Sequence, residues 1–330
     1  MIKIKEIVKA CVLAAPLLFS TVNAHAQDDV ATLSECTTID ADITAKARDL
    51  LKNGMDSLGS NYGQVAVVDA RTGHLKAWVA LEKSHNTISD SKLQKKAFNS
   101  YSLLYTIVPT LLADSGGSLA DSVDTDCGIL DIGDGYEVKD HNWRRGGYGM
   151  MTMREALIKK SNVAMYKIMA KSMGNEKAAI LWRKIANSDH TTNAMQMAAI
   201  LSSVYCGTQV TVPTLKGDSL EVLPFANTSD LGRQYMKEVL TGMCGSDGQQ
   251  SQIAPKTVEI AGVYVFNYTN ANSKKDKRFS EMSFVGVVPA EAPRYAIAVF
   301  LDKKVETTIG TSILADYVVN KLVEWLAEHK

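Results

Sequence analysis

The sequence predicts an α/β fold of the α+β kind, an antiparallel five-stranded sheet covered by helices. Two apolar runs flank a turn at residues 69–73 and predict an early hairpin. Three further runs of strand composition lie near the end of the chain, with no helical pattern between them. Helical patterns fill the interval, so we expect a helical subdomain inserted between strands two and three, over about residues 100–245.

The first elements follow from spacing and from glycine. Residues 43–58 have apolar positions at helical spacing, and Gly59 ends that run. The hairpin spans residues 63–81, and Gly73 supplies the positive φ that its turn requires. Residues 82–96 are polar and charged, so we expect a loop there.

The remaining elements are read from the same patterns. A buried helix follows Tyr101 and ends at Gly116. Further helices are expected over residues 151–160, 163–173, 178–186, 194–205 and 231–243, and strands over 257–266, 281–288 and 295–301. A last helix has an apolar face from Ile313 to Leu326. The first and last helices should cover one face of the sheet.

Composition excludes several classes of protein. The chain has 330 residues, with 46% hydrophobic and 22% charged, which is typical of a globular protein. Lysine plus arginine equals aspartate plus glutamate at 36 each, and no basic stripe is interleaved with aromatics, so no nucleic-acid partner is expected. The six histidines and five cysteines show no zinc-site spacing, so neither metal nor cofactor is expected.

The first 26 residues have the pattern of a signal peptide. Three lysines precede an apolar run at residues 10–22, and Ala24-His25-Ala26 fits the cleavage rule. We therefore expect a periplasmic or extracellular protein, membrane-anchored if the leader stays uncleaved, with a lead segment at 27–42 and one domain at 43–330. After cleavage four cysteines remain: Cys36, Cys127, Cys206 and Cys244. They could form two disulfides or stay as four free thiols, and the sequence leaves both alternatives open.

Several strings in order resemble the transpeptidase domain of penicillin-binding proteins. Gly63–Ala77 resembles that family's opening hairpin, and Lys139–Asn142 with Tyr148–Leu157 resembles the approach to its second motif. Glu281–Val299 resembles its last hairpin. The resemblance covers about residues 60–325. It implies a serine acyl-transferase fold that acts on peptidoglycan stem peptides and is acylated by β-lactams.

The family's chemistry depends on three motifs, and each is altered in this chain. The Ser-x-x-Lys motif aligns with Ser102 as the candidate nucleophile, and Tyr105 stands at the position of the lysine base. The Ser-x-Asn motif reads Lys160-Ser161-Asn162, so the asparagine is kept and the first serine is replaced.

The third motif, Lys-Thr-Gly, is replaced altogether. At its position the chain reads Val263-Tyr264-Val265, without the cation that would hold a substrate carboxylate. The resemblance also places Trp143 beside the cleft, in a loop with two arginines, where it is a candidate for ligand binding or an ordinary exposed residue.

Other interpretations of these residues remain open. Ser102 is a candidate helix N-cap, and Lys160 a candidate displaced base. Asp140, His141 and Ser102 could form a triad, which the sequence favours less. Literal near-matches occur at 89–92, Ser-x-x-Lys in a polar loop, and at 256–258, Lys-Thr-Val.

The altered motifs predict a catalytically impaired pseudoenzyme with a binding or scaffolding role in peptidoglycan metabolism. Its expected partners are a stem peptide, a β-lactam or a cell-wall synthesis protein. The alternatives are an active D,D-peptidase that uses Ser102 with Lys160, and a sensor that binds wall peptide or β-lactam without acylation.

Overall fold

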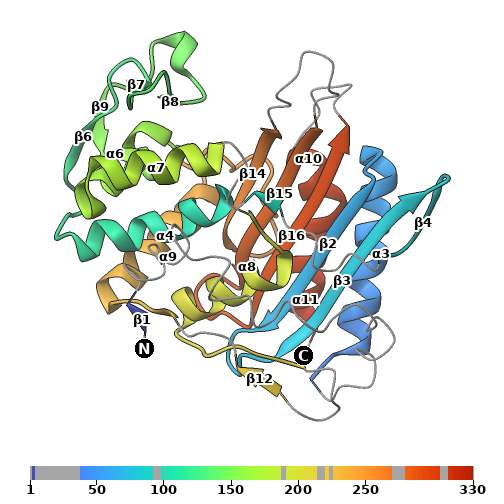
Figure 1. The fold of residues 1–330 in the computed structure, drawn as a ribbon. Helices are drawn as coiled ribbons and strands as arrows, with labels where there is room; N and C mark the ends of the chain where they lie inside the picture. The colour runs from blue at the N-terminus through green and yellow to red at the C-terminus, as the bar shows by residue number, and fades with distance from the viewer. Residues whose placement is uncertain are drawn as a thin grey trace.

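A six-stranded antiparallel sheet forms the centre of the molecule, in the order β14-β15-β16-β2-β3-β4. The computed structural model describes residues 2–3, 38–91, 98–99, 101–186, 191–213, 220–222, 226–269, 279–304 and 311–329. The six strands are β2 (Tyr62–Asp69), β3 (Leu75–Ser84), β4 (Thr87–Asp90), β14 (Ala261–Thr269), β15 (Phe279–Val288) and β16 (Tyr295–Lys304). Figure 1 shows helices on both sides of this sheet.

The sixth strand corrects the sequence prediction, which placed a loop over 82–96 and counted five strands. β3 continues to Ser84, and the chain then reverses through His85 and Asn86, with φ angles of 47° and 64°. Two consecutive left-handed residues make the tight turn that hairpins prefer, although no glycine marks it. β4 lies at the sheet edge and is largely exposed, so its polar composition concealed it.

The β2–β3 turn depends on glycine, as predicted. Gly73 has a φ of 74°, and a Cβ atom there would lie 2.0 Å from the carbonyl oxygen of Gln209. A side chain would therefore be strained by its backbone conformation and would also clash with a neighbouring segment.

The first and last helices cover one face of the sheet, which confirms the prediction. These are α3 (Ala41–Leu58), α10 (Thr311–Leu314), the π-helix η4 (Ala315–Val319) and α11 (Asn320–Glu328). Leu51, Met55 and Leu322 pack with Val299 of the sheet in one buried cluster. Asp40 caps α3 by accepting from two backbone N–H groups, and Gly59 ends it.

The helices between β4 and β14 form a block on the other side, where α4, α8 and α9 contact the sheet. They are α4 (Tyr101–Asp114), α5 (Met153–Ile158), α6 (Asn162–Met173), α7 (Asn175–Ala186), α8 (Ala194–Leu201), the π-helix η3 (Ser202–Cys206) and α9 (Asp230–Cys244). α4 is buried on all sides except at its ends, since α6 and α9 flank it and the sheet lies beneath. The candidate site lies on the first turn of this helix.

Short strands occupy the segments around these helices. They are β5 (Phe98–Asn99), β6 (Ser122–Asp124), β7 (Ile129–Asp131), β8 (Glu137–Lys139), β9 (Met150–Thr152), β10 (Thr191–Thr192), β11 (Thr211–Pro213), β12 (Leu220–Val222) and β13 (Ala226–Asn227), with the 3-10 turn η2 (Trp143–Arg145). The predicted helix at 151–160 starts late because residues 150–152 pair with β6 as β9. Thr152 then caps α5 in a capping box with Glu155.

The structure describes little of the predicted leader and three of the four remaining cysteines. Most of the predicted signal peptide lies outside the described residues, although Ile2–Lys3 forms a short strand, β1, beside β13. Cys127, Cys206 and Cys244 are free thiols, and Cys36 lies outside the described residues. Within the described ranges, no helix is long and apolar enough to cross a membrane, and no cluster of metal-binding side chains occurs.

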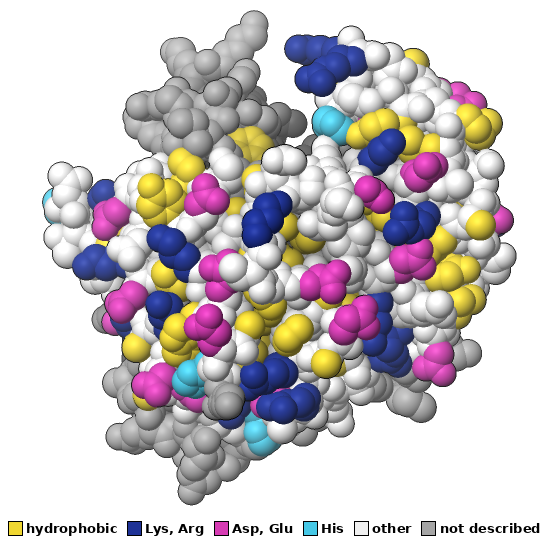
Figure 2. Space-filling model, turned by 180° about the vertical axis from the view of Figure 1, so that it is seen from behind, with side chains coloured by type: hydrophobic (Ala, Val, Ile, Leu, Met, Phe, Trp, Pro, Cys, Tyr) yellow, Lys and Arg dark blue, Asp and Glu magenta, His cyan; other side chains and the backbone are white. Residues whose placement is uncertain are grey.

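Surface charge is evenly mixed on the face opposite to that of Figure 1. Figure 2 shows acidic and basic side chains interspersed there, with apolar side chains between them. This agrees with the equal totals of 36 basic and 36 acidic residues. Neither sign of charge dominates this face.

Candidate functional site

Ser102, the candidate nucleophile, is fully buried. It is the second residue of α4, with an exposed fraction of 0%, and its Oγ donates to the Sδ of Met197 on α8 at 3.8 Å. The helix already begins at Tyr101, so the prediction that Ser102 is its N-cap is wrong. A serine in this position faces a thioether and has no access to solvent.

Tyr105, one turn further along α4, occupies the position of the missing lysine. Its hydroxyl donates to Asn162 Oδ1 at 2.8 Å, and the Nδ2 of Asn162 donates to the carbonyl of Lys139 at 2.7 Å. Burial raises the pKa of Tyr105 well above its usual range, so the phenol stays protonated near neutral pH. It therefore serves as a hydrogen-bond donor and cannot replace a general base.

The side-chain amide of Asn162 is held at both ends. It is the first residue of α6, and both ends of its side-chain amide hold partners from the chain itself. Each end of this amide therefore has one of its two hydrogen-bonding positions occupied, and these bonds fix the orientation of the side chain.

Lys160 is held against the sheet, away from Ser102. It has a φ of 59°, and its Nζ donates to the carbonyl of Tyr264 at 2.7 Å. The same nitrogen lies 5.0 Å from the centre of the Tyr105 ring, a cation–π distance. Burial lowers the pKa of Lys160 to about 8, and the nearby Cys244 thiol counters this in part. In the part of the chain that the structure describes, no hydrogen bond joins Lys160 to Ser102.

The third-motif position is part of strand β14. Val263 and Val265 point toward the helical block, whereas the Tyr264 side chain points to the opposite face, where its hydroxyl donates to Asn320 at 2.8 Å. The Gln250 amide donates to the Tyr264 carbonyl at 2.5 Å and accepts from its N–H at 3.1 Å.

Gln250 therefore closes the free edge of β14 at Tyr264. An extended peptide that adds to a sheet edge needs unpaired backbone groups, and both groups of this residue are taken. The cation and the glycine of the family motif are absent as well, because valines stand on either side.

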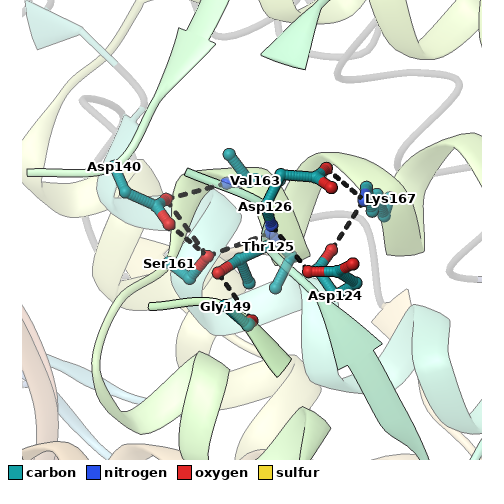
Figure 3. Close-up of polar contacts among 9 residues, drawn as sticks. Asp124, Thr125, Asp126, Asp140, Gly149, Ser161, Val163 and Lys167 are labelled. Atoms are coloured by element: carbon teal, nitrogen blue, oxygen red, sulfur yellow. Dashed lines mark hydrogen bonds and ion pairs between the residues drawn. The ribbon is translucent and has the colours of Figure 1, made fainter. Parts of the chain in front are cut away.

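Asp140 positions the altered second motif (Figure 3). This carboxylate is fully buried and accepts from the Ser161 hydroxyl at 2.9 and 3.1 Å and from the Val163 N–H at 3.0 Å. Ser161 in turn caps α6 by accepting from the N–H of Ala164. Burial raises the pKa of Asp140, and these hydrogen bonds oppose that effect. The network fixes the backbone from which Lys160 and Asn162 project.

The considered triad is not assembled. The carboxylate of Asp140 faces the start of α6, and Ser102 faces Met197. His141 instead contacts the Tyr148 hydroxyl and the Gln249 amide, each at 3.1 Å from Nδ1. Its pKa is lowered by burial, although Asp140 opposes this shift.

Trp143 lies among cations of its own chain. The Lys139 Nζ is 4.8 Å and the Arg144 guanidinium 5.1 Å from the centre of its ring, so this half-buried indole already has cation–π partners. No described contact joins Trp143 to Ser102.

Both literal near-matches lie elsewhere in the fold. Ser89 is exposed on the edge strand β4, and its Lys92 lies outside the described residues. Thr257 precedes β14 and donates to Glu324 of α11 at 2.6 Å, on the side of the sheet opposite α4. Neither segment takes part in the candidate site.

Three contacts at the site were not predicted from the sequence. Met197 accepts from Ser102, Gln250 closes β14, and the carbonyl of Lys139 holds Asn162. Met197 and Gln250 are 95 and 14 residues from their partners, and neither belongs to a short motif.

Comparison with known proteins rests on structure. No family model and no curated protein matches the sequence. The transpeptidase domain of penicillin-binding protein 3 from Burkholderia pseudomallei, in its apo structure, superposes with a TM-score of 0.67 at 17% identity, over 87% of this chain and 94% of that one. The chain has the fold of a penicillin-binding protein transpeptidase domain.

Two further structures share this transpeptidase-like fold. Penicillin-binding protein 2B from Streptococcus pneumoniae has a TM-score of 0.70 at 14% identity, over 89% of this chain and 60% of that one. A peptidoglycan glycosyltransferase from Burkholderia ambifaria has a TM-score of 0.65 at 18% identity, over 88% and 97%. At such identities the likeness shows the fold, and the chemistry has to be argued from the site itself.

Proposed function

We propose that this chain is a catalytically impaired relative of the penicillin-binding proteins, with a binding or scaffolding role in peptidoglycan metabolism. One observation carries the proposal: the serine at the nucleophile position is fully buried, and its hydroxyl donates to the Met197 thioether. Acyl transfer requires a serine hydroxyl that lies beside a general base and that the carbonyl carbon of the substrate can reach. Ser102 has neither.

The rest of the centre supports the same conclusion. Tyr105 is a protonated phenol bonded to Asn162, and Lys160 is bonded to the backbone of Tyr264. Loss of a positioned general base alone lowers a rate by about 10²–10⁴-fold. Because each polar group has a partner within the chain, the centre is arranged as a packed interior.

Acylation by a β-lactam tests this proposal. The purified chain is incubated with a fluorescent penicillin, and the intact mass is measured together with that of Ser102→Ala and Ser89→Ala. We expect no covalent adduct in any of the three. An adduct that disappears in Ser102→Ala would refute the impairment, and one that disappears in Ser89→Ala would assign the chemistry to the literal Ser-x-x-Lys string.

An active enzyme with Lys160 as the base is the second candidate. It is favoured by the lowered pKa of Lys160, about 8, since a lysine is a useful base only when it is neutral near working pH. In this candidate, Ser102 must leave Met197 and Lys160 must leave Tyr264. Adduct formation that requires both side chains, and that rises with pH through about 8, would select it.

Location and partners complete the proposal. The leader pattern supports export, and a mature chain that begins at Gln27 in bacterial periplasm or culture medium would bear this out. A wall peptide, a β-lactam bound without acylation, or a wall-synthesis protein is the proposed partner. A thermal shift on adding penicillin, without a mass increase, would identify a sensor of such ligands.

A further inference from the structure

A second concave site lies on the outer side of the helical block. A cavity of about 830 Å³ opens between α6, α7 and the β7–β8 hairpin, which Figure 1 shows side by side. We call it the α6–α7 groove, and its characteristic residues are Asp131, Lys171, Glu176 and Ile180. Its volume falls in the range of sites for small ligands and short peptides, and none of its lining residues belongs to the candidate site.

The middle of the groove is apolar. Leu130 and Ile132 of the hairpin, Ala170 of α6 and Ala179 of α7 line it there. Ile180 is 37% exposed, which makes it one of four large hydrophobic side chains that are exposed among the described residues. Such a surface favours small aliphatic groups.

The charges at the groove fall into two groups. Lys167 pairs with Asp126 at 3.2 Å, and Arg183 pairs with Asp134 at 2.7 Å. These cations are already neutralised within the chain, so they contribute little attraction to a ligand.

The other charges have no such pairing. Lys171, Glu176 and Asp131 make no ion pair within the described ranges, and all three are exposed. One oxygen of Asp131 accepts from the N–H of Gly133 at 2.8 Å, which leaves its other oxygen for a ligand. Lys171 lies in the last turn of α6 and Glu176 in the first turn of α7. The groove thus presents one cation and two carboxylates that have no ion-pair partner among the described residues, around an apolar middle.

We infer that the α6–α7 groove binds a short peptide that carries both a free ammonium group and a free carboxylate, with small aliphatic side chains. The ammonium pairs with Glu176 and Asp131, the carboxylate pairs with Lys171, and methyl groups cover the apolar middle. A ligand with one sign of charge would satisfy only part of this surface, so selection for both charges distinguishes the inference from nonspecific attraction.

A natural reporter lies beside the groove. Tyr166 lines it, and its ring packs edge-on against Trp182 with centroids 6.0 Å apart. Trp182 is buried, so its fluorescence responds to changes in this packing. The Trp182→Phe variant removes the reporter. Because Trp182 also packs against Tyr101 of α4, with ring centroids 5.7 Å apart, the charge variants of the groove are needed to assign the signal to it.

The test uses tetra-alanine with both termini free, titrated into the full chain by calorimetry and fluorescence. We expect binding that weakens with salt, and that weakens about five- to tenfold in Lys171→Glu and in Glu176→Lys. The matched control is Lys177→Glu, an exposed α7 charge outside the groove, which should bind as the wild type does. An acetylated and amidated peptide should bind at least about fivefold more weakly.

Three results would overturn the inference. They are binding that both charge reversals leave unchanged, equal binding of the blocked peptide, and no binding up to about 10 mM. Unchanged melting temperatures of the surface variants confirm that they fold. The peptide titration is independent of the test of the proposed function, which fails only if a covalent adduct forms. Failure of the groove inference can therefore be told from failure of the proposed function.

Discussion

Replacing Lys160 by methionine should stabilise the protein at neutral pH. The change removes a half-buried ammonium and keeps a side chain of similar length. The carbonyl of Tyr264 loses one donor but retains Gln250, so no buried acceptor is left without a partner. The variant therefore isolates the electrostatic consequence of burying this lysine.

The size of the effect follows from the pKa of Lys160, which burial lowers from 10.5 to about 8. That change corresponds to about 3 kcal/mol against the folded state at pH values below both pKa values. Partial exposure of the Lys160 side chain reduces this penalty. In the variant, loss of the hydrogen bond to Tyr264 removes about 1 kcal/mol of the remaining gain. We expect a net gain in the free energy of unfolding of about 1–2 kcal/mol at pH 7.

The gain should disappear as the pH rises. Between the folded pKa of about 8 and the unfolded value of 10.5, the unfolded chain binds more protons than the folded one, so this lysine contributes a rise in wild-type stability with pH. Cys206 and Cys244, with pKa values raised to about 12 by burial, act in the opposite direction. For that reason the difference between wild type and Lys160→Met, and not the wild-type curve, is the quantity to measure.

Urea unfolding at pH 7 and at about pH 10 measures this difference. Lys159→Met is the matched control, because it makes the same replacement at the adjacent lysine. The Nζ of Lys159 lies 5.8 Å from the centre of the Tyr148 ring. The control should shift stability by less than about 0.5 kcal/mol at both pH values. Equal effects of Lys160→Met at both pH values, or destabilisation at pH 7, would refute the reasoning.

The other predictions concern neighbouring positions. Tyr105→Phe leaves the Asn162 acceptor without its donor and should destabilise by about 1–3 kcal/mol, measured by urea unfolding. Its control is Tyr166→Phe, whose hydroxyl reaches a carbonyl only at 3.5 Å and whose loss should matter little; equal effects would contradict the assignment. Asp140→Ala removes a buried carboxylate that accepts from two donors, the Ser161 hydroxyl and the Val163 N–H, and should destabilise by about 2–4 kcal/mol in the same assay; a neutral result would show that the network is dispensable. Tyr105→Lys rebuilds the Ser-x-x-Lys spacing but should give no penicillin adduct by intact mass, because the helix serine remains buried.

Much of the fold was accessible from the sequence, because periodicity and glycine mark it. Two apolar runs with Gly73 between them predicted the β2–β3 hairpin, and Gly59 predicted the end of α3. β4 was missed because its turn uses His85 and Asn86 in place of glycine, and because an exposed edge strand has no apolar face.

The candidate site was predictable only where its residues share an element. Helix geometry places Tyr105 one turn after Ser102, whatever the tertiary structure. The partner of Tyr105 lies 57 residues away, and that of Lys160 lies 104 residues away. Such pairs depend on how α4, α6 and β14 pack, and no local spacing contains that information.

The pairing of Tyr105 with Asn162 also changes how mutations at this centre should be tolerated. Active sites commonly hold strained or unsatisfied groups that lower stability, and substitutions there trade folding against turnover. Here the hydroxyl and the amide satisfy each other, as in any well-packed core. In a systematic mutational scan, the cost of substitutions at these positions should depend on burial and hydrogen bonding alone. Selection on them should then act through the abundance of folded protein.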